Sequence, residues 1–341
     1  MTHSVAVLGA AGYAGALSAA LVERHPSLQL RYVTARGGDV GRSLADLYPH
    51  HRVPLTLEEL DPDRHACVDA AIVAYPHGAA AEVVSELVAR GVRVVDLSAD
   101  FRLRDPAVYA EWYREHPSPE LIADAVYGLP ELYREALRGA QLVANPGCYP
   151  TAAILSLAPL ARAGLIADVV IDAKSGVSGA GRAATEKTHF VTVDENLSPY
   201  GVPRHRHTPE IEQELSTLLG FDLKLTFTPH LIPLDQGELV SCYVTLPPCG
   251  GTINRTDSIE RVRELYESAY ADEPFVELTE AMPGVRDVRD TNICRISVNR
   301  DERTGRVIVF GVIDNLWKGA ASQAVQNLNL MLGLPEGEGI S

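Results

Sequence analysis

Residues 4–15 read Ser-Val-Ala-Val-Leu-Gly-Ala-Ala-Gly-Tyr-Ala-Gly. The apolar run Val5–Leu8 predicts a short buried strand, and the residues after it predict a helix that Pro26 ends. Glycines between a strand and a helix let the backbone approach a pyrophosphate, whose charge is met by free amides at the helix N-terminus. The spacing is GxxGxxG rather than GxGxxG, so a tight turn in another kind of α/β domain is the alternative. The residues expected at this dinucleotide site are Gly9, Gly12, Tyr13 and Gly15.

The alternation of strands and helices continues through the first half of the chain. Further buried strands are predicted at Leu28–Thr34, Ala70–Ala74, Val92–Leu97 and Leu142–Ala144. A helical pattern at Ala79–Ala89 separates two of these strands, and Gly91 ends it. Strands that alternate with helices favour a doubly wound parallel sheet with right-handed crossovers, which is the Rossmann type of α/β fold.

The second half of the chain has a different pattern, with more alternating strands and fewer helices between them. The strand-like segments are Val169–Ala173, Asp222–His230, Leu239–Leu246, Cys294–Asn299 and Val307–Ile313. The helical segments lie near Tyr149–Ala163, Pro209–Leu219, Asp257–Ala271 and Gly319–Met331. This order favours a mixed or antiparallel sheet covered on one face by helices. The predicted fold class is therefore α/β, with an N-terminal Rossmann domain followed by an α+β domain.

Composition and charge narrow the possible functions. Lys and Arg number 30 against 45 Asp and Glu, so the net charge is -15, which argues against a general nucleic-acid or anionic-membrane surface. Five cysteines without a CxxC pair predict neither a disulfide framework nor a metal site, and reduced thiols suit the cytoplasm. No targeting segment is recognisable, and no apolar run reaches the roughly 20 residues of a spanning helix.

The end of the second predicted strand indicates which dinucleotide binds. NAD sites usually have an acidic residue there that accepts a hydrogen bond from the ribose 2′-hydroxyl. This chain has Thr34-Ala35-Arg36 instead, and arginine binds phosphate with two N–H donors. We therefore predict that Thr34 and Arg36 bind the 2′-phosphate of NADP(H). The alternative for Arg36 is a solvated surface charge.

A cysteine stands at the predicted start of a helix in residues 145–151, Asn-Pro-Gly-Cys-Tyr-Pro-Thr. The helix dipole and the free amides there lower the pKa of a thiol and also stabilise an oxyanion. Pro150 suits the first helical turn, where its missing N–H costs nothing. Cys148 is therefore the predicted nucleophile. The other cysteines are interpreted as small buried hydrophobic residues: Cys67, Cys242, Cys249 and Cys294.

A nucleophilic thiol usually has a base close in space, and residues 205–210, His-Arg-His-Thr-Pro-Glu, contain two candidates. Thr208 is the predicted N-cap and Pro209 the first helical residue, so both histidines precede a helix whose positive end favours neutral imidazole. His207 is the predicted acid/base and His205 the alternative. A capped surface helix with incidental charge is the other interpretation. The substrate-binding candidates in this segment are Arg206 and Glu210.

Two more segments are candidates for binding anions, because each follows a predicted strand. Ser98–Arg102 contributes Arg102, and Lys174–Arg182 contributes Lys174. The second segment is rich in glycine, which allows close approach of the backbone to a ligand. It lacks the GxxxxGK[ST] pattern and is not a P-loop. Taken alone, either segment is equally compatible with a plain loop.

Seven ordered sequence blocks together resemble one enzyme family over essentially the full chain. They are GAAGYAG (9–15), DLSADFRL (96–103), VYGLPELYRE (126–135), NPGCYPTA (145–152), KSGVSGAGR (174–182), YGVPRHRHTPEI (200–211) and DNLWKGAASQAVQN (314–327). The family is N-acetyl-gamma-glutamyl-phosphate reductase, an NADP-dependent oxidoreductase of arginine biosynthesis. Its fold is similar to that of aspartate-semialdehyde dehydrogenase: a Rossmann domain and a catalytic domain of the glyceraldehyde-3-phosphate dehydrogenase type.

The resemblance implies a role for each candidate residue. Cys148 attacks the acyl phosphate, inorganic phosphate leaves, and NADPH reduces the thioester to N-acetylglutamate 5-semialdehyde, with His207 or His205 as the acid/base. Arg102 corresponds to a phosphate-binding arginine of the aspartyl relatives, a transfer that crosses subfamilies. The residues implied near the nicotinamide are Ser178, Gly179 and Asn315.

The resemblance also implies a domain division and leaves two rival functions. Residues 1–147 with 314–341 are expected to bind NADP, and residues 148–313 to carry catalysis and the contacts of a homo-oligomer, either a dimer or a tetramer. One rival is the carrier-protein-linked aminoadipyl-phosphate reductase of lysine biosynthesis, whose cysteine motif lacks the Tyr-Pro at 149–150. The other is a non-catalytic NADP-binding regulator, which Cys148 and the histidine pair disfavour.

Overall fold

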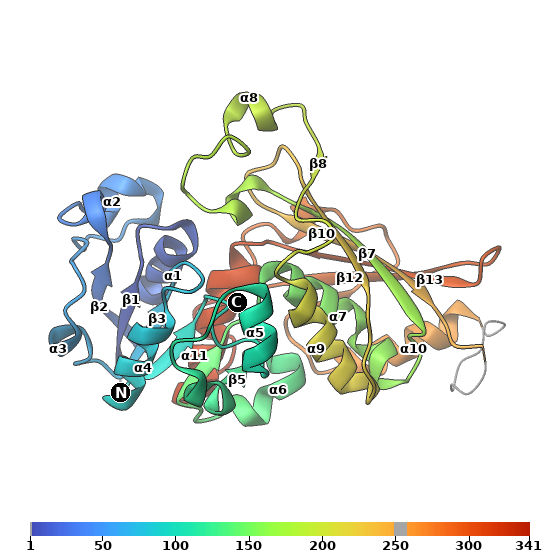
Figure 1. Cartoon of the computed structure of the whole chain (residues 1–341), viewed down its shortest axis with the longest axis horizontal. Coiled ribbons are helices and arrows are strands. Elements are labelled where there is room, and N and C mark those ends of the chain that lie inside the picture. The colour runs from blue at the N-terminus through green and yellow to red at the C-terminus, as the bar shows by residue number, and fades with distance from the viewer. Residues whose placement is uncertain (1, 249–257) are drawn as a thin grey trace. The chain divides into compact units, whose positions relative to one another are not determined.

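The computed structural model describes residues 2–248 and 258–341. These residues form two compact units, Met1–Gly147 together with Ala320–Ser341, and Cys148–Gly319 (Figure 1). The predicted division had its second boundary before Asp314 rather than after Gly319. Which unit binds the cofactor and which carries the chemistry remains a prediction. The predictions for Cys249 and for Asp257 as a helix start fall outside the described residues.

The first unit is built on a six-stranded sheet in the order β2-β1-β3-β4-β6-β5, and every pair of neighbours is parallel. Its strands are β1 (His3–Leu8), β2 (Leu28–Thr34), β3 (Ala70–Val73), β4 (Arg93–Asp96), β5 (Val126–Tyr127) and β6 (Leu142–Ala144). The residues of β3 and β6 are all buried, as expected for a parallel sheet covered on both faces. The prediction of an N-terminal Rossmann-type sheet is confirmed.

Helices from both ends of the chain complete the first unit. They are α1 (Tyr13–Arg24), α2 (Leu44–Leu47), α3 (Pro62–His65), α4 (Ala81–Ala89), α5 (Pro106–Trp112), α6 (Pro130–Leu137) and α11 (Ser322–Leu332). Helix α11 contacts α1, α6 and β4. The amide of Asn327 donates to the Gly128 carbonyl at 2.8 Å and to Asn145 Oδ1 at 2.9 Å, and so links α11 to residues beside β5 and β6. The last helix therefore belongs to this unit.

The second unit contains a seven-stranded mixed sheet in the order β11-β12-β13-β10-β7-β9-β8. Its strands are β7 (Asp168–Ser175), β8 (Ser198–Pro199), β9 (Thr226–Leu231), β10 (Glu238–Thr245), β11 (Val276–Leu278), β12 (Cys294–Asp301) and β13 (Arg306–Ile313). Two neighbour pairs, β7 with β9 and β11 with β12, are parallel, and the others are antiparallel. The central strand β10 places Glu238 opposite Ser175 on one side and Ile313 on the other. The predicted mixed sheet is confirmed.

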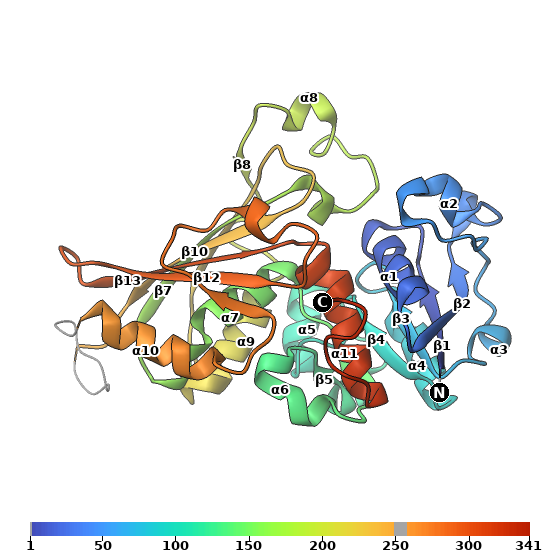
Figure 2. The same ribbon diagram turned by 180° about the vertical axis from the view of Figure 1, so that it is seen from behind.

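Helices of the second unit gather on one face of this sheet, as both ribbon views show (Figure 1 and Figure 2). They are α7 (Cys148–Arg162), α9 (Thr208–Leu219) and α10 (Ile259–Tyr270), and the short α8 (Phe190–Val193) lies away from them. The hydroxyl of Tyr266 on α10 donates to the Ser156 carbonyl at 2.7 Å, and that of Tyr270 donates to the Leu155 carbonyl. These bonds fasten α10 to α7.

Several predicted helix ends lie one to three residues from the observed ones, and the predicted N-cap of α9 is wrong. Helix α9 begins at Thr208, and His207 rather than Thr208 is its N-cap. The physical reason is that the His207 carbonyl accepts the first intrahelical bond, from Ile211 N at 3.1 Å, which is the task of the N-cap residue. The buried Thr208 hydroxyl accordingly has no hydrogen-bond partner among the described residues.

Candidate functional site

The three glycines of the first turn differ in whether the surrounding chain leaves room for a side chain. Gly9 has φ +86°, and a Cβ on it would lie 2.5 Å from the Ala74 carbonyl oxygen. A Cβ on Gly15 would overlap the Gly9 backbone. By contrast, a Cβ on Gly12, the N-cap residue of α1, would meet only the Gly9 oxygen, at 3.7 Å. Packing therefore explains Gly9 and Gly15, whereas Gly12 leaves the N-terminus of α1 open to a ligand.

Thr34 and Arg36 lie beside this turn in different environments. Thr34 is buried, and its hydroxyl lies 3.4 Å from Gly9 N and 3.4 Å from the Tyr75 hydroxyl. It therefore contacts the backbone of the glycine turn and helps to hold it in place. Arg36 is exposed, and its guanidinium carbon lies 4.2 Å from the centre of the Tyr75 ring. Stacking on an aromatic face orients a guanidinium while its N–H groups remain available to an anion.

Cys148 is the first residue of α7, and the strand β6 ends four residues before it. The first turn of α7 contains no acidic side chain, so the positive end of the helix is uncompensated there. The thiol residue is half-buried. Gly319 lies against it, because a Cβ on Gly319 would be 2.8 Å from Cys148 Cβ. The nucleophile predicted from the sequence thus lies at a helix N-terminus, as expected.

A buried carboxylic acid that the sequence analysis did not select lies next to this thiol. Glu238 is 0% exposed, and no described backbone N–H group donates to its carboxyl oxygens. Burial raises its pKa to about 8, and the neighbouring Cys148 thiol and Ser175 hydroxyl oppose that shift. The available signal was its register: Glu238 is in phase with the buried Val240 and Cys242 of the same strand.

Two of the residues implied near the nicotinamide are joined in the second unit. Asn315 donates from Nδ2 to Ser178 Oγ at 3.0 Å and accepts from Gly237 N at 2.7 Å. It thereby links the loop after β7 to the start of β10. A Cβ on Gly179 would lie 3.1 Å from Ser175 Oγ, so the loop passes close to the end of β7. Ser178, Gly179 and Asn315 therefore form one cluster beside Glu238.

The two candidate histidines lie in an aromatic cluster around Tyr149, the residue after Cys148. The ring centres of His205 and His207 are 4.9 Å apart, and each lies 5.9 Å from the Tyr149 ring. His205 Nδ1 accepts from His207 N at 3.2 Å, so a neutral His205 carries its proton on Nε2. Burial lowers the pKa of His205 to about 4, and the adjacent Arg206 charge adds to the effect. His205 is therefore neutral at physiological pH.

The hydroxyl groups of Tyr149 and Tyr200 are hydrogen-bonded to each other beside the two histidines. The Tyr200 hydroxyl donates to that of Tyr149 at 3.3 Å, and Tyr149 donates to the His230 carbonyl at 3.4 Å. Burial raises the pKa of both phenols, so both remain protonated. The sequence analysis missed both roles, because only the pairing of β8 with β9 carries the segment of Tyr200 alongside the site.

The other predicted anion-binding residues have diverse surroundings. Lys174 pairs with Asp172 at 2.7 Å, and Asp172 also lies 3.2 Å from His230 Nδ1. Arg206 is exposed, whereas Glu210 in the first turn of α9 is 1% exposed. The structure thus places Lys174 on the sheet and the other two at the start of α9.

Arg102 belongs to a buried polar network of the first unit. Its Nε donates to the Asn145 carbonyl and its Nη2 to the Leu97 carbonyl, both at 2.8 Å. Burial raises the pKa of the nearby Asp96 to about 7, although Asp96 accepts bonds from the Ser98 backbone and hydroxyl. Arg102 therefore links the end of β4 to the turn that leads towards Cys148.

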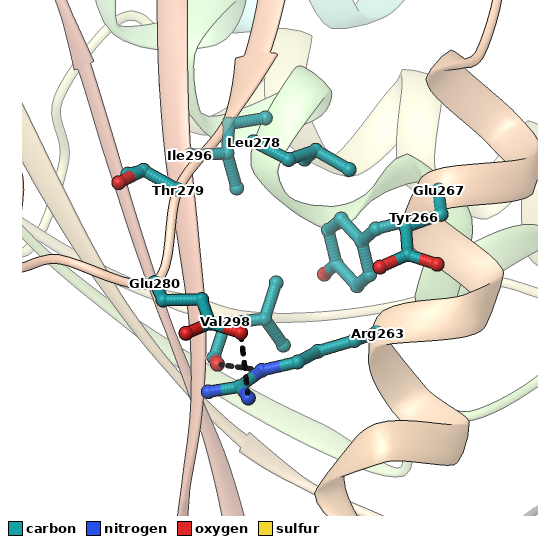
Figure 3. A pocket seen from close by; sticks show the side chains of 8 residues that line it. All are labelled: Arg263, Tyr266, Glu267, Leu278, Thr279, Glu280, Ile296 and Val298. Carbon is teal, nitrogen blue, oxygen red and sulfur yellow. Dashed lines mark hydrogen bonds and ion pairs between the residues drawn. The ribbon is translucent and has the colours of Figure 1, made fainter.

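A surface hollow lies between α10 and the sheet, away from all predicted site residues (Figure 3). Arg263 spans it, with Nε 3.3 Å from the Val298 carbonyl and Nη1 3.9 Å from Glu280. Its lining consists of Arg263, Tyr266, Glu267, Leu278, Thr279, Glu280, Ile296 and Val298. Within residues 2–248 and 258–341 there is no cluster of three or more potential metal ligands. No helix of the described chain is long and apolar enough to cross a bilayer.

Family models match both units. Residues 4–140 match a semialdehyde dehydrogenase NAD binding domain, and residues 148–315 match a semialdehyde dehydrogenase dimerisation domain. Among solved structures, aspartate semialdehyde dehydrogenase II from Vibrio cholerae, complexed with ASA, gives a TM-score of 0.74 at 19% identity over 98% of this chain and 99% of that one. The Candida albicans enzyme with NADP gives 0.72 at 15% identity, with the same coverage. These similarities show the fold.

Curated relatives are much closer in sequence. The N-acetyl-gamma-glutamyl-phosphate reductase of Moorella thermoacetica is 50% identical over 97% of this chain and 95% of its own length. That of Desulforudis audaxviator is also 50% identical, over 98% of this chain and 97% of its own. A third, from Alkalilimnicola ehrlichii, is 48% identical with the same coverage as the second.

Proposed function

Because the chain belongs to the N-acetyl-gamma-glutamyl-phosphate reductase family, we propose that it reduces N-acetyl-L-glutamyl 5-phosphate to N-acetyl-L-glutamate 5-semialdehyde and phosphate, with NADPH, in arginine biosynthesis. The observation that carries this proposal is Cys148, a half-buried thiol at the N-terminus of α7 next to a buried carboxylic acid. A thiol in that position suits covalent acyl transfer better than direct hydride transfer to a carboxylate.

The residues of the chain divide the reaction into two easier steps. The Cys148 thiolate attacks the C5 carbonyl, the bond to the phosphate oxygen breaks, and phosphate leaves with the electron pair. Backbone amides at the start of α7 would stabilise the oxyanion that forms on the carbonyl. The thioester that results accepts a hydride more readily than a carboxylate does, and the hemithioacetal then releases the aldehyde and regenerates the thiolate. His207, or alternatively His205, acts as acid/base.

NADPH fits the glycine turn, and it supplies the hydride for the second step. The open N-cap at Gly12 leaves room for the pyrophosphate beside the free amides of α1. Arg36, stacked on Tyr75, would bind the 2′-phosphate, and the buried Thr34 would hold the turn in place. Tyr13, Gly9 and Gly15 are assigned to the same dinucleotide site. Ser178, Gly179 and Asn315 would face the nicotinamide.

Four further residues are assigned to substrate binding. Arg102, Arg206 and Lys174 carry the positive charge, and Glu210 would position Arg206 or a substrate N–H. Because Lys174 is paired with Asp172, its charge is partly balanced. We assign NADP binding mainly to residues 1–147 with 314–341, and catalysis and most substrate contacts to residues 148–313; Arg102, Ser178 and Gly179 are the exceptions.

A homodimer is the assembly that the second unit favours, and a tetramer would pair two such dimers. The face of the seven-stranded sheet opposite the helices presents half-buried Leu239, Tyr243, Ile308 and Phe310. A second copy would cover this apolar strip. The cytoplasm is the proposed location, with no nucleic-acid or membrane partner. Replacing Phe310 with Glu should then halve the mass measured by light scattering.

The direct test is oxidation of N-acetylglutamate semialdehyde by NADP, measured with and without phosphate. Phosphate-dependent turnover supports the proposed reaction, and NAD should be the poorer cofactor. The same assay with the aminoadipate analogue distinguishes the lysine-pathway rival. No turnover with either aldehyde, despite NADPH binding, would support the non-catalytic regulator instead.

A further inference from the structure

Glu238 is exceptional among the buried carboxyl groups of the chain. Asp100 accepts bonds from the backbone N–H groups of Gly78, Ala80 and Ala81, and Asp314 accepts from those of Asp290, Leu316 and Trp317. Those carboxylates hold loops and helix ends in place. No described backbone N–H group donates to Glu238, and its side chain is 0% exposed. Its carboxyl group lies instead beside the Cys148 thiol and the Ser175 hydroxyl, so it fastens no loop or helix end.

A buried carboxyl group that has neither a cation nor a backbone donor beside it is costly to ionise. Such a group tends to remain protonated instead. An apolar residue at this position would continue the pattern of Val240, Cys242 and Val244 without that cost. The position of the acid is therefore better explained by chemistry than by packing.

Groups on several neighbouring elements interact with Glu238. From α7 come the Cys148 thiol and the Tyr149 phenol, and from β7 comes the hydroxyl of Ser175, its partner across the strand pair. Asp314, after β13, raises the pKa of Glu238 through its negative charge. Burial raises the pKa of Tyr200, and the charge of Glu238 adds to that effect. No cation is among these neighbours. Among these neighbours, the Cys148 thiol is the predicted nucleophile, and it carries a proton that a carboxylate can accept.

We propose that Glu238 is a catalytic residue that takes the proton of the Cys148 thiol and returns it after the aldehyde has left. The proton moves from Sγ to a carboxyl oxygen, leaving a thiolate and a neutral acid, so the pair keeps one negative charge during this transfer; that charge leaves with phosphate when the thioester forms. The thiolate forms the C–S bond while the C–O bond to phosphate breaks, and the proton that phosphate needs comes from solvent. When the hemithioacetal collapses, the C–S bond breaks and the acid reprotonates the sulfur.

This assignment deepens the proposed function and rests on it for the substrate, but not for the proton exchange. It also gives Glu238 and the histidines different roles in proton transfer. Glu238 serves the thiol, whereas His207 or His205 serves the carbonyl oxygen. With its pKa raised to about 8, Glu238 loses its proton as pH rises through that value, so the reactive form of the pair increases with pH in the same range.

The test is the rate of Cys148 alkylation by iodoacetamide as a function of pH, followed by peptide mass spectrometry. Two groups that share a proton titrate in two steps, so the wild-type rate should rise in two steps, the lower with a midpoint near pH 8. Glu238→Gln should reduce the profile to one step. It should also lower kcat at pH 7.5 by about 10²-fold, as loss of a general base does, and change the NADPH dissociation constant less than about twofold.

Control variants separate chemistry from packing. Glu214→Gln alters another fully buried glutamate, which accepts a bond from Gln213, and should leave both steps in place. Glu238→Asp should retain two steps with a shifted lower midpoint, and it carries the test if the Gln variant does not fold. A single step in the wild type, or unchanged kcat and profile in Glu238→Gln, would overturn the proposal. Two-step labelling without phosphate-dependent turnover would instead refute the proposed reaction and leave the proton pair standing.

Discussion

Helices α1 and α7 begin in closely similar ways and present different chemistry. Each follows a buried parallel strand and a turn containing glycine, and neither has an acidic residue in its first turn. At α1 the N-cap is Gly12, which offers only backbone amides and space. At α7 the first residue is Cys148, with the buried Glu238 beside it. On the proposed function, the same positive helix end would bind an anion where a side chain is absent and would activate a nucleophile where a thiol is present.

The largest effect expected from this comparison is at α7. Cys148→Ser should abolish turnover and leave NADPH binding intact, because an alkoxide is far less accessible than a thiolate near neutral pH. Steady-state kinetics and a fluorescence titration with NADPH measure the two quantities. Cys67→Ser is the matched control, since that thiol is exposed and lies in the other unit. Substantial turnover in Cys148→Ser would mean that both helix ends only bind.

The histidine pair gives the next largest effect. His207→Asn should lower kcat by about 10²–10⁴, as loss of a general acid/base does, with little change in cofactor affinity. His205→Asn should cost less, because its Nδ1 already accepts the His207 backbone N–H. If His205→Asn is the damaging change and His207→Asn is silent, the two roles are reversed.

At the cofactor end, the expected change is in selectivity rather than rate. Arg36→Ala should reduce the preference for NADPH over NADH by about 10–100-fold, because a charge-assisted hydrogen bond is worth about 1.5–3 kcal/mol. The ratio of kcat/KM values with the two cofactors measures it. Arg31→Ala, at an exposed position on the same strand β2, should leave the ratio unchanged. The same loss in both variants would assign the effect to net charge.

The smallest effect separates the two uses of glycine within the first turn. Gly12→Ala should fold normally, since its Cβ has room, but weaken NADPH binding by about tenfold, or about 1.4 kcal/mol. Gly15→Ala should instead lower the free energy of unfolding by roughly 1–3 kcal/mol, because its Cβ would overlap the Gly9 backbone. Urea unfolding and cofactor titration of both variants test this. A destabilised Gly12→Ala with normal NADPH affinity would contradict the assignment.

The apolar and alternating segments of the sequence predicted most strands and helices, because a residue's hydrophobicity follows its burial. The strand predicted at Leu28–Thr34 coincides with β2, and the one at Leu142–Ala144 coincides with β6. The start of α9 was displaced by one residue, since Thr208 has the side chain of an N-cap but not its backbone position. Strands of two residues, such as β5 and β8, are too short to show any period.

The candidate site was only partly predictable, because its remaining members are brought in by long-range pairing. Cys148 was selected by its place between a glycine turn and a helix. Glu238 was not selected, because an acidic residue before an apolar run is usually part of a surface loop. Only its pairing with Ser175 in the sheet shows that it is buried. Tyr200 likewise becomes relevant only when its hydroxyl meets that of Tyr149.

The central claim is that Cys148 carries the acyl group, and the most direct measurement omits phosphate from the reverse reaction. The thioester formed from the semialdehyde then has no nucleophile to release it, so NADP reduction should stop after about one turnover per active site. Arsenate should restore turnover, because it supplies an equivalent attacking oxyanion. Sustained NADP reduction without phosphate or arsenate, with the same rate in Cys148→Ser, would contradict the covalent mechanism.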